Sequence, residues 1–128
     1  MARILVADDD PLIRDMVSAT LARAGHDFEL VSTGQQALNR LRDGDFELVI
    51  ADIFMPDGTG IELLISMRAK RIDLPFICIS GGDGDLFRPY VTTMVSLGAY
   101  TVLRKPFTPA KLLDAVSYAI IGATPEHA

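Results

Sequence analysis

The chain has 128 residues, enough for one domain with a substantial core, and 49% of them are hydrophobic, which excludes a disordered chain. Seventeen acidic and 12 basic side chains give a net charge of −5, which argues against non-specific binding to nucleic acid or an anionic membrane. A single cysteine excludes an internal disulfide framework, and no apolar run has the length of a signal peptide or a membrane span, so we expect a cytoplasmic domain.

The first part of the chain contains two short apolar runs, each followed by a helical pattern. Residues 4–7 predict a buried strand, and Pro11 is suited to open the helix that follows. Residues 28–31 predict the second strand. Ser32, with Gln35 three residues later, resembles a capping box, a reciprocal pair of hydrogen bonds at the start of a helix.

The middle of the chain repeats this alternation. Residues 48–51 and 76–79 are apolar runs that predict buried strands. The helix between them is expected to bury a stripe of Ile61, Leu64 and Ile65. A Gly-rich loop follows, and we expect the next helix over residues 90–97, with Pro89 limiting where it can begin.

The last unit combines a strand at residues 101–103 with a helix that Thr108 caps and Pro109 opens. Five consecutive strand–helix units predict an α/β protein. The economical arrangement is a three-layer α/β/α sandwich, in which a five-stranded parallel sheet has helices on both faces. Right-handed crossovers leave few topologies for such a chain.

Polar side chains end four of the five predicted strands. They are Asp8, Asp9 and Asp10 after the first, Asp52 after the third, Ser80 after the fourth and Lys105 after the fifth. Ligands of open α/β sheets bind outside the carboxyl ends of the strands, so we expect these groups to converge at one edge.

The chemistry of these groups favours phosphoryl transfer. Carboxylate oxygens suit Mg²⁺, whereas a lysine and a hydroxyl can bind phosphate oxygens. An aspartate can also attack phosphorus and form an aspartyl phosphate. Mg²⁺, Lys105 and Ser80 would then stabilise the transferring group.

Each group also has an ordinary explanation when it is taken alone. Asp52, Ser80 or Lys105 could each simply begin a turn. The acids at 8–10 could serve as capping and first-turn charges of the helix at Pro11, and we assign Asp10 to that role. Their occurrence at the same end of different strands is what favours a shared site.

The sequence resembles a known family, the receiver domain of two-component response regulators, in its chemotaxis-type single-domain form. The resemblance is carried by ILVADDDP (4–11), LVIADIFMPDGTG (48–60), PFICISGG (75–82) and LGAYTVLRKPF (97–107). It implies a flavodoxin-like sheet in the order 2-1-3-4-5. We expect the receiver domain to span residues 1–122, with a short tail at 123–128. It is either a stand-alone receiver, which we favour, or the receiver of a longer regulator.

The resemblance implies a role for each site residue. Asp52 matches the phosphoacceptor, and Ser80 and Lys105 match the hydroxyl and the ammonium that contact the phosphoryl group. Asp8, Asp9, Asp52 and the backbone carbonyl of Phe54 match the Mg²⁺ ligands. The family's bond between lysine and proline, here Lys105–Pro106, is cis.

The resemblance also implies the partners. A sensor histidine kinase or a histidine phosphotransfer protein would donate the phosphoryl group. A downstream protein would bind the face made by the fourth helix, fifth strand and fifth helix, with no direct contact to nucleic acid or membrane. The domain would accept the group and slowly lose it, without enzymatic turnover.

Two features depart from the family pattern. The aromatic switch position is Val102, and the nearest aromatic, Tyr100, is two residues earlier and so expected on the same face. The segment from 80 to 98 is also longer than usual. We therefore hypothesise that residues 82–97, and not an aromatic rotamer, carry the signal.

Two alternative functions stay open. A haloacid-dehalogenase-like phosphatase would use Asp8 as the nucleophile with Asp10, but an acidic pair expected after the lysine is missing. A degenerate receiver would act only as a binding module, although the complete set of site residues argues against this.

Overall fold

The computed structural model describes residues 2–81 and 84–122, without the side chains of 84–88 and 90. Its long strands are β1 (Arg3–Ala7), β2 (Asp27–Val31), β3 (Leu48–Asp52), β6 (Phe76–Ser80) and β7 (Thr101–Arg104). Two short strands, β4 (Phe54–Met55) and β5 (Gly58–Thr59), form an antiparallel hairpin. The helices are α1 (Pro11–Arg23), α2 (Gly34–Asp43), α3 (Gly60–Ala69), α4 (Gly84–Ser96) and α5 (Pro109–Ile121).

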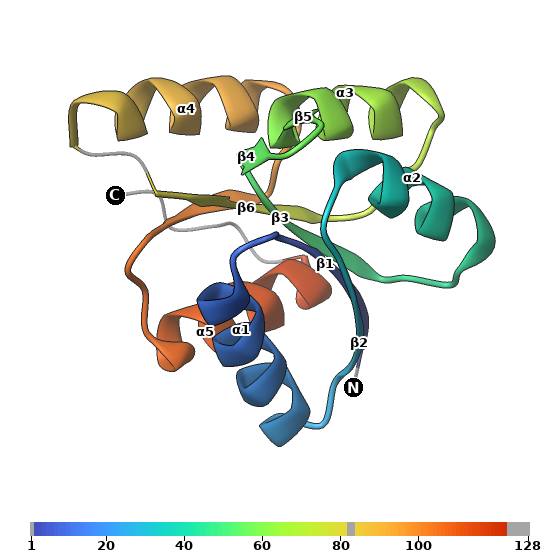
Figure 1. The fold of residues 1–128 in the computed structure, drawn as a ribbon, viewed down its shortest axis with the longest axis vertical. Coiled ribbons are helices and arrows are strands. Elements are labelled where there is room, and N and C mark those ends of the chain that lie inside the picture. The colour runs from blue at the N-terminus through green and yellow to red at the C-terminus, as the bar shows by residue number, and fades with distance from the viewer. Residues whose placement is uncertain (1, 82–83, 123–128) are drawn as a thin grey trace.

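The long strands form one parallel sheet in the order β2-β1-β3-β6-β7. Helices α1 and α5 cover one face of this sheet, and α2, α3 and α4 cover the other (Figure 1). When the hairpin is left out of the numbering, the order is 2-1-3-4-5. The predicted three-layer, flavodoxin-like sandwich is therefore confirmed.

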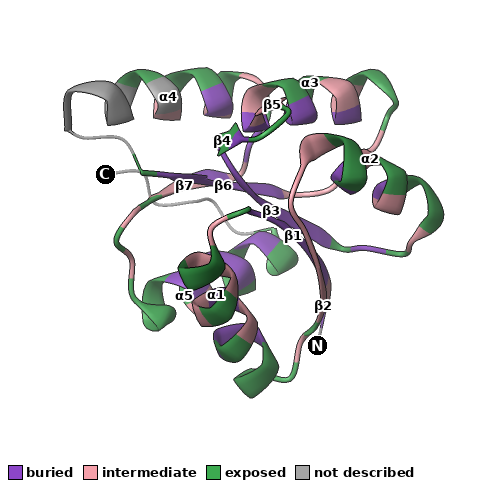
Figure 2. Ribbon diagram, viewed as in Figure 1, coloured by how far each residue is buried: buried purple, intermediate pink, exposed green. Residues whose placement is uncertain are grey.

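The sheet is buried on both faces, and its alternating side chains feed two separate cores (Figure 2). In β1, Leu5 and Ala7 join the core beneath α2 and α3, whereas Ile4 and Val6 join the core beneath α1 and α5. This two-sided burial explains why the strands read as continuous apolar runs. The strand ends, where the apolar runs stop, are left to carry polar groups.

The predicted capping box is displaced by one residue. The N-cap of α2 is Thr33, not Ser32, and its hydroxyl accepts from the Gln36 amide at 3.1 Å. Gln36, not Gln35, returns the bond by accepting from the Ser32 amide at 2.8 Å. The first two helix amides are instead bound by a remote acid, Asp57, which local sequence spacing cannot show.

Two helix predictions were wrong in detail. Ile65 is 50% exposed, whereas Leu63, Leu64 and Met67 are buried, because the face toward the sheet follows positions 60, 63, 64 and 67. Helix α4 begins at Gly84 and contains Pro89, so the proline does not set the start of the helix. A proline inside a helix removes the hydrogen bond from its own amide and crowds the carbonyl four residues earlier, yet here the helix continues through it.

Tyr100 does not share a face with Val102. Val102 packs against the core on the α2–α3 side, and Tyr100 packs against the core on the α1–α5 side. The strict alternation of side chains fails because β7 begins only at Thr101, so Tyr100 lies before the strand. The expectation that residues 82–97 carry the signal falls partly outside the described residues and stays a prediction.

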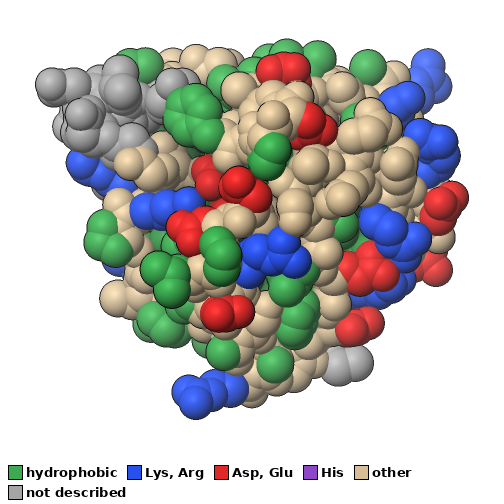
Figure 3. All heavy atoms as spheres, in the orientation of Figure 1, with side chains coloured by type: hydrophobic (Ala, Val, Ile, Leu, Met, Phe, Trp, Pro, Cys, Tyr) green, Lys and Arg blue, Asp and Glu red, His purple; other side chains and the backbone are tan. Residues whose placement is uncertain are grey.

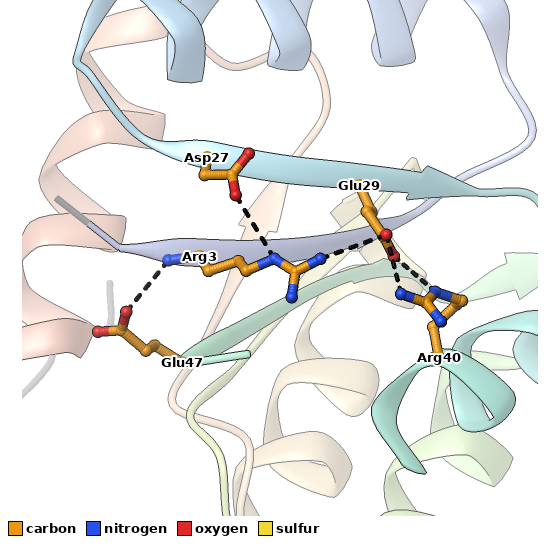
Figure 4. A network of polar contacts seen from close by, with 5 residues as sticks. All are labelled: Arg3, Asp27, Glu29, Arg40 and Glu47. Carbon is orange, nitrogen blue, oxygen red and sulfur yellow. Dashed lines mark hydrogen bonds and ion pairs between the residues drawn. The ribbon is translucent and has the colours of Figure 1, made fainter. Parts of the chain in front are cut away.

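A network of charged side chains joins β1, β2 and α2 on the sheet face away from α1 and α5 (Figure 4). The Glu29 carboxylate accepts from Arg40 Nε at 2.8 Å and from Arg40 Nη2 at 3.0 Å, and Arg3 Nη2 lies 3.3 Å from Glu29 Oε1. Arg3 also lies 3.5 Å from Asp27 and stacks over Phe46, 4.6 Å from the ring centroid. The network lies at the amino end of β1, where it ties the edge strand β2 to β1 and α2. It does not reach the carboxyl ends of the strands.

Among residues 2–81 and 84–122, no helix combines the length and the apolar character needed to span a membrane. The expected tail at 123–128 lies outside the described residues.

Candidate functional site

The polar groups at the strand ends lie at one edge of the sheet, as predicted. Asp52 and Ser80 are the last residues of β3 and β6, whereas Asp8 and Lys105 directly follow β1 and β7. The strands stand in parallel register there, with Asp52 opposite Ile79 and Ser80 opposite Arg104. Acidic side chains gather near the middle of the molecular face that carries these ends, beside basic ones (Figure 3).

The Asp52 carboxylate is held on both of its oxygens. Oδ1 accepts from the Phe54 amide at 3.3 Å, and Oδ2 accepts from Lys105 Nζ at 3.0 Å. The side chain is largely buried but reaches the surface, with 10% of its area exposed. A carboxylate fixed in this way by a rigid strand is oriented before any ligand arrives.

Asp8 is fully buried beside Asp52. Its Oδ1 accepts from the Asp10 amide at 2.8 Å, but its Oδ2 has no hydrogen-bond partner. Burial and, to a smaller extent, the charge of Asp52 outweigh the opposing effects of the Asp10 amide and Lys105, and together these influences raise the pKa of Asp8 to about 6. A buried carboxylate oxygen that has only a long ion pair, with Lys105 at 3.6 Å, and no hydrogen bond is costly, so this atom is suited to bind a cation.

Asp8, Asp9 and Asp52 can each offer a carboxylate oxygen within 4.8 Å of the others. Asp9 is exposed, so the cluster opens to solvent on its side. Asp10, in contrast, caps α1 by accepting from the Leu12 amide at 3.0 Å, as predicted. The three acids therefore form a cluster from which Asp10 is excluded by its structural role.

Lys105 links the acids to the neighbouring strands. Its Nζ lies 3.0 Å from Asp52 Oδ2 and 3.6 Å from Asp8 Oδ2, and its backbone amide donates to the Ser80 carbonyl at 2.8 Å. Burial acts to lower the pKa of Lys105, but the hydrogen bond and charge of Asp52 and the charge of Asp8 outweigh it and raise that pKa. The ammonium thus stays charged at neutral pH. The Lys105–Pro106 bond is cis, as the resemblance implied.

Ser80 and Phe54 complete the predicted set. Ser80 is fully buried at the end of β6, between the strand that ends in Asp52 and the strand that leads to Lys105. The Phe54 side chain is 54% exposed, and the Phe54 backbone amide is the group directed at Asp52.

The donor set suits a divalent, oxygen-preferring cation. Three carboxylates and one ammonium, all ionised, leave two negative charges, which one Mg²⁺ cancels. The Asp8 oxygen that lacks a hydrogen-bond partner belongs to this set. Among the described residues, no other group of three such ligands comes together.

Gly60 is a site residue whose role the sequence did not reveal. It opens α3, and its amide donates to the Ile53 carbonyl at 2.7 Å. A Cβ atom at this position would lie 2.6 Å from the backbone oxygen of Asp52. Only glycine allows α3 to approach the end of β3 so closely. The sequence feature that could have revealed this role is the glycine that ends the MPDGTG stretch.

We expect Gly60→Ala to destabilise the protein by about 1–3 kcal/mol, because the added methyl group must push the Asp52 backbone away. Urea unfolding measures the loss. The matched control is Gly34→Ala, at the first position of α2, where the added Cβ meets Asp57 only at 3.6 Å and should change stability by less than about 1 kcal/mol. Equal stability of the two variants would contradict the tight approach at Gly60.

Comparisons with known proteins agree with this geometry. The family model described as the response regulator receiver domain matches residues 4–117. The transcriptional regulator NtrC of Rhizobium meliloti is 34% identical over 121 residues, and FixJ of Bradyrhizobium diazoefficiens is 37% identical over 122 residues. A CheY-like receiver domain protein from Methanospirillum hungatei is 28% identical, with a TM-score of 0.85 over 95% of both chains.

The matches cover nearly all of this chain but only part of the curated relatives. The NtrC match covers 93% of this chain and 24% of the relative, and the FixJ match covers 95% and 58%. The shared part is thus the receiver unit and not the whole regulator. With its fold, its strand-end site and its sequence in agreement, the chain belongs to the receiver domain family of two-component response regulators.

Proposed function

We propose that this domain is a Mg²⁺-dependent phosphoacceptor, with Asp52 as the residue that takes the phosphoryl group. The strongest support is that Asp52, aligned by Phe54 and Lys105, lies beside a buried oxygen of Asp8 that has no hydrogen-bond partner. Such a set of oxygen ligands would suit a divalent cation, which would offset the charge of the acids.

Asp8, Asp9 and Asp52 would hold Mg²⁺, with the backbone carbonyl of Phe54 as a further ligand. Bound there, Mg²⁺ supplies positive charge that lowers the repulsion between the acids and the phosphate oxygens. Lys105 already neutralises one charge of the cluster. The other roles in phosphoryl transfer fall to side chains of the protein itself.

Asp52 acts as the nucleophile. An oxygen of its carboxylate forms a bond to phosphorus while the phosphorus–nitrogen bond to the donor histidine breaks and the imidazole nitrogen takes the electron pair. The Lys105 ammonium, which donates to the Asp52 oxygen, can pass this hydrogen bond to a phosphoryl oxygen during the transfer. The Ser80 hydroxyl donates a hydrogen bond to another phosphoryl oxygen.

The donor would be a sensor histidine kinase or a histidine phosphotransfer protein. The added charge of roughly −1.5 to −2 would draw Ser80 and Lys105 inward and alter the surface of α4, β7 and α5, where a downstream protein binds. We also propose residues 1–122 as the functional unit and the cytoplasm as its location. The relatives NtrC and FixJ are longer than this unit.

A small-molecule phosphodonor tests this function. Protein incubated with acetyl phosphate and Mg²⁺ should gain the mass of one phosphoryl group, and the same reaction with a chelator should give none. A gain that does not need Mg²⁺ would contradict the metal site. Sustained release of phosphate from many phosphomonoesters would instead favour a phosphatase.

A further inference from the structure

The hairpin that follows Asp52 is tied to a helix distant in sequence. Asp57, at the tip between β4 and β5, accepts from the Gly34 amide through Oδ1 at 2.9 Å and from the Gln35 amide through Oδ2 at 2.9 Å. These are the first two amides of α2, which have no acceptor within the helix. The Thr33 hydroxyl takes the third.

This contact is a charge-assisted anchor. Both oxygens of one carboxylate are used, and the positive end of the α2 dipole faces the negative charge. The amides of Gln35 and Gly34 lower the pKa of Asp57, so the anchor is ionised at neutral pH. A local acceptor such as the Thr33 hydroxyl is enough to cap a helix. Here a second acceptor, Asp57, comes from 22 and 23 residues further along the chain.

The hairpin needs outside support to hold its position. It contains only two residue pairs, Phe54 with Thr59 and Met55 with Gly58, and so short a ribbon is not stable alone. Met55 is buried in the core beneath α2, which fixes one side of the hairpin. The Phe54 side chain is more than half exposed, so burial contributes little to its placement.

The placement of Phe54 affects the site directly. Its amide holds Asp52 Oδ1, and its carbonyl is the proposed backbone ligand of the cation. Resting on the proposed function, we infer that Asp57 is a positioning residue, which sets the Phe54 backbone beside the acidic cluster by anchoring the hairpin tip to the first turn of α2.

Asp57→Ala tests this from the hairpin side, and Asp45→Ala, an exposed acid of equal charge, is the control. Mg²⁺ affinity is measured by calorimetry at 25 °C, well below the melting temperature, and the Phe54 amide is followed by NMR. We expect the dissociation constant for Mg²⁺ to rise about tenfold in Asp57→Ala and by less than twofold in Asp45→Ala. Labelling by acetyl phosphate should be slow at low Mg²⁺ and recover toward the wild-type rate at saturating Mg²⁺.

Gly34→Pro tests the same contact from the helix side without changing any charge. The proline ring replaces the amide hydrogen at which Asp57 Oδ1 is aimed, whereas proline itself is favoured at the first position of a helix. Gly34→Ala keeps the amide and serves as the control. Gly34→Pro should weaken Mg²⁺ binding. Its effect should not add to that of Asp57→Ala, because Asp57→Ala already removes the hydrogen bond that Gly34→Pro removes.

A purely structural cap predicts a different result. In that case Asp57→Ala would melt a few degrees lower, but its Mg²⁺ affinity and the Phe54 amide shift would match those of the wild type. That outcome would overturn the positioning role and leave the proposed function intact. Wild-type protein without any Mg²⁺ binding would overturn both.

Discussion

Asp52→Asn protein is expected to gain no phosphoryl group from acetyl phosphate under conditions that label the wild type fully. The amide oxygen that replaces the carboxylate carries no negative charge and is a weak nucleophile, so we expect a rate at least about a hundredfold lower. The fold should survive, because the amide oxygen can still accept from the Phe54 amide and because β3 is buried around it. Intact-protein mass spectrometry over time measures the labelling.

The control for this experiment is Asp45→Asn, which makes the same change of charge on an exposed loop and should be labelled at the wild-type rate. Labelling of Asp52→Asn at the wild-type rate would move the phosphoacceptor to another residue, Asp9 being the nearest exposed carboxylate of the cluster.

Asp8→Asn is expected to make the Mg²⁺-free protein more stable at pH 7.5, by about 1–3 kcal/mol. The folded-state pKa of Asp8 is about 6, against an ordinary value of 3.8 for an aspartate, and each unit of difference corresponds to about 1.36 kcal/mol. The substitution removes the cost of burying the charge, although the new amide can leave a hydrogen without a partner and reduce the gain.

The sign of the pH dependence follows from the raised pKa. Between about pH 4 and 6 the folded protein keeps a proton on Asp8 that the unfolded chain has lost, so wild-type stability falls as the pH rises through this range. The difference between the variant and the wild type should therefore be small near pH 4 and largest above pH 6. Urea unfolding followed by circular dichroism at several pH values measures it.

Mg²⁺ should reverse the order of stability. It stabilises the folded wild type by binding the acids, whereas Asp8→Asn lacks one ligand and should gain little. Below pH 6 much of Asp8 carries a proton, which it must lose before it can bind Mg²⁺. Wild-type Mg²⁺ binding should therefore be weaker in this pH range. An Asp8→Asn variant that is less stable than the wild type in the absence of Mg²⁺ at pH 7.5 would contradict this description of the site.

The fold could be predicted because burial on both faces of the sheet leaves a strong pattern. Every long strand was found within about one residue, and the differences occurred where a polar residue continues the backbone ladder, as Asp52 and Ser80 do. A strand is defined by its backbone hydrogen bonds, so a polar side chain does not mark its end. Asp52 and Ser80 are also two of the polar residues that form the candidate site at the carboxyl edge of the sheet.

The details that sequence could not supply depend on contacts between distant segments. Asp57 binds the start of α2, whose cap is Thr33 and not Ser32, and nothing near either segment in sequence reveals this contact. Gly60 is required by the closeness of the Asp52 backbone, which becomes visible only when α3 is packed. Tyr100 was assigned to the wrong face because the start of β7 depends on its pairing with β6.

The central claim is that Asp8, Asp9 and Asp52 bind a divalent cation beside the phosphoacceptor Asp52. A structure of crystals grown with Mn²⁺ and beryllofluoride tests it most directly, because Mn²⁺ accepts the same oxygen ligands as Mg²⁺ and is identified by its anomalous scattering. We predict one Mn²⁺ coordinated by Asp8, Asp9 and Asp52, and beryllofluoride attached to Asp52 in contact with Ser80 and Lys105. Metal bound away from these acids, or beryllofluoride attached to another side chain, would contradict the account.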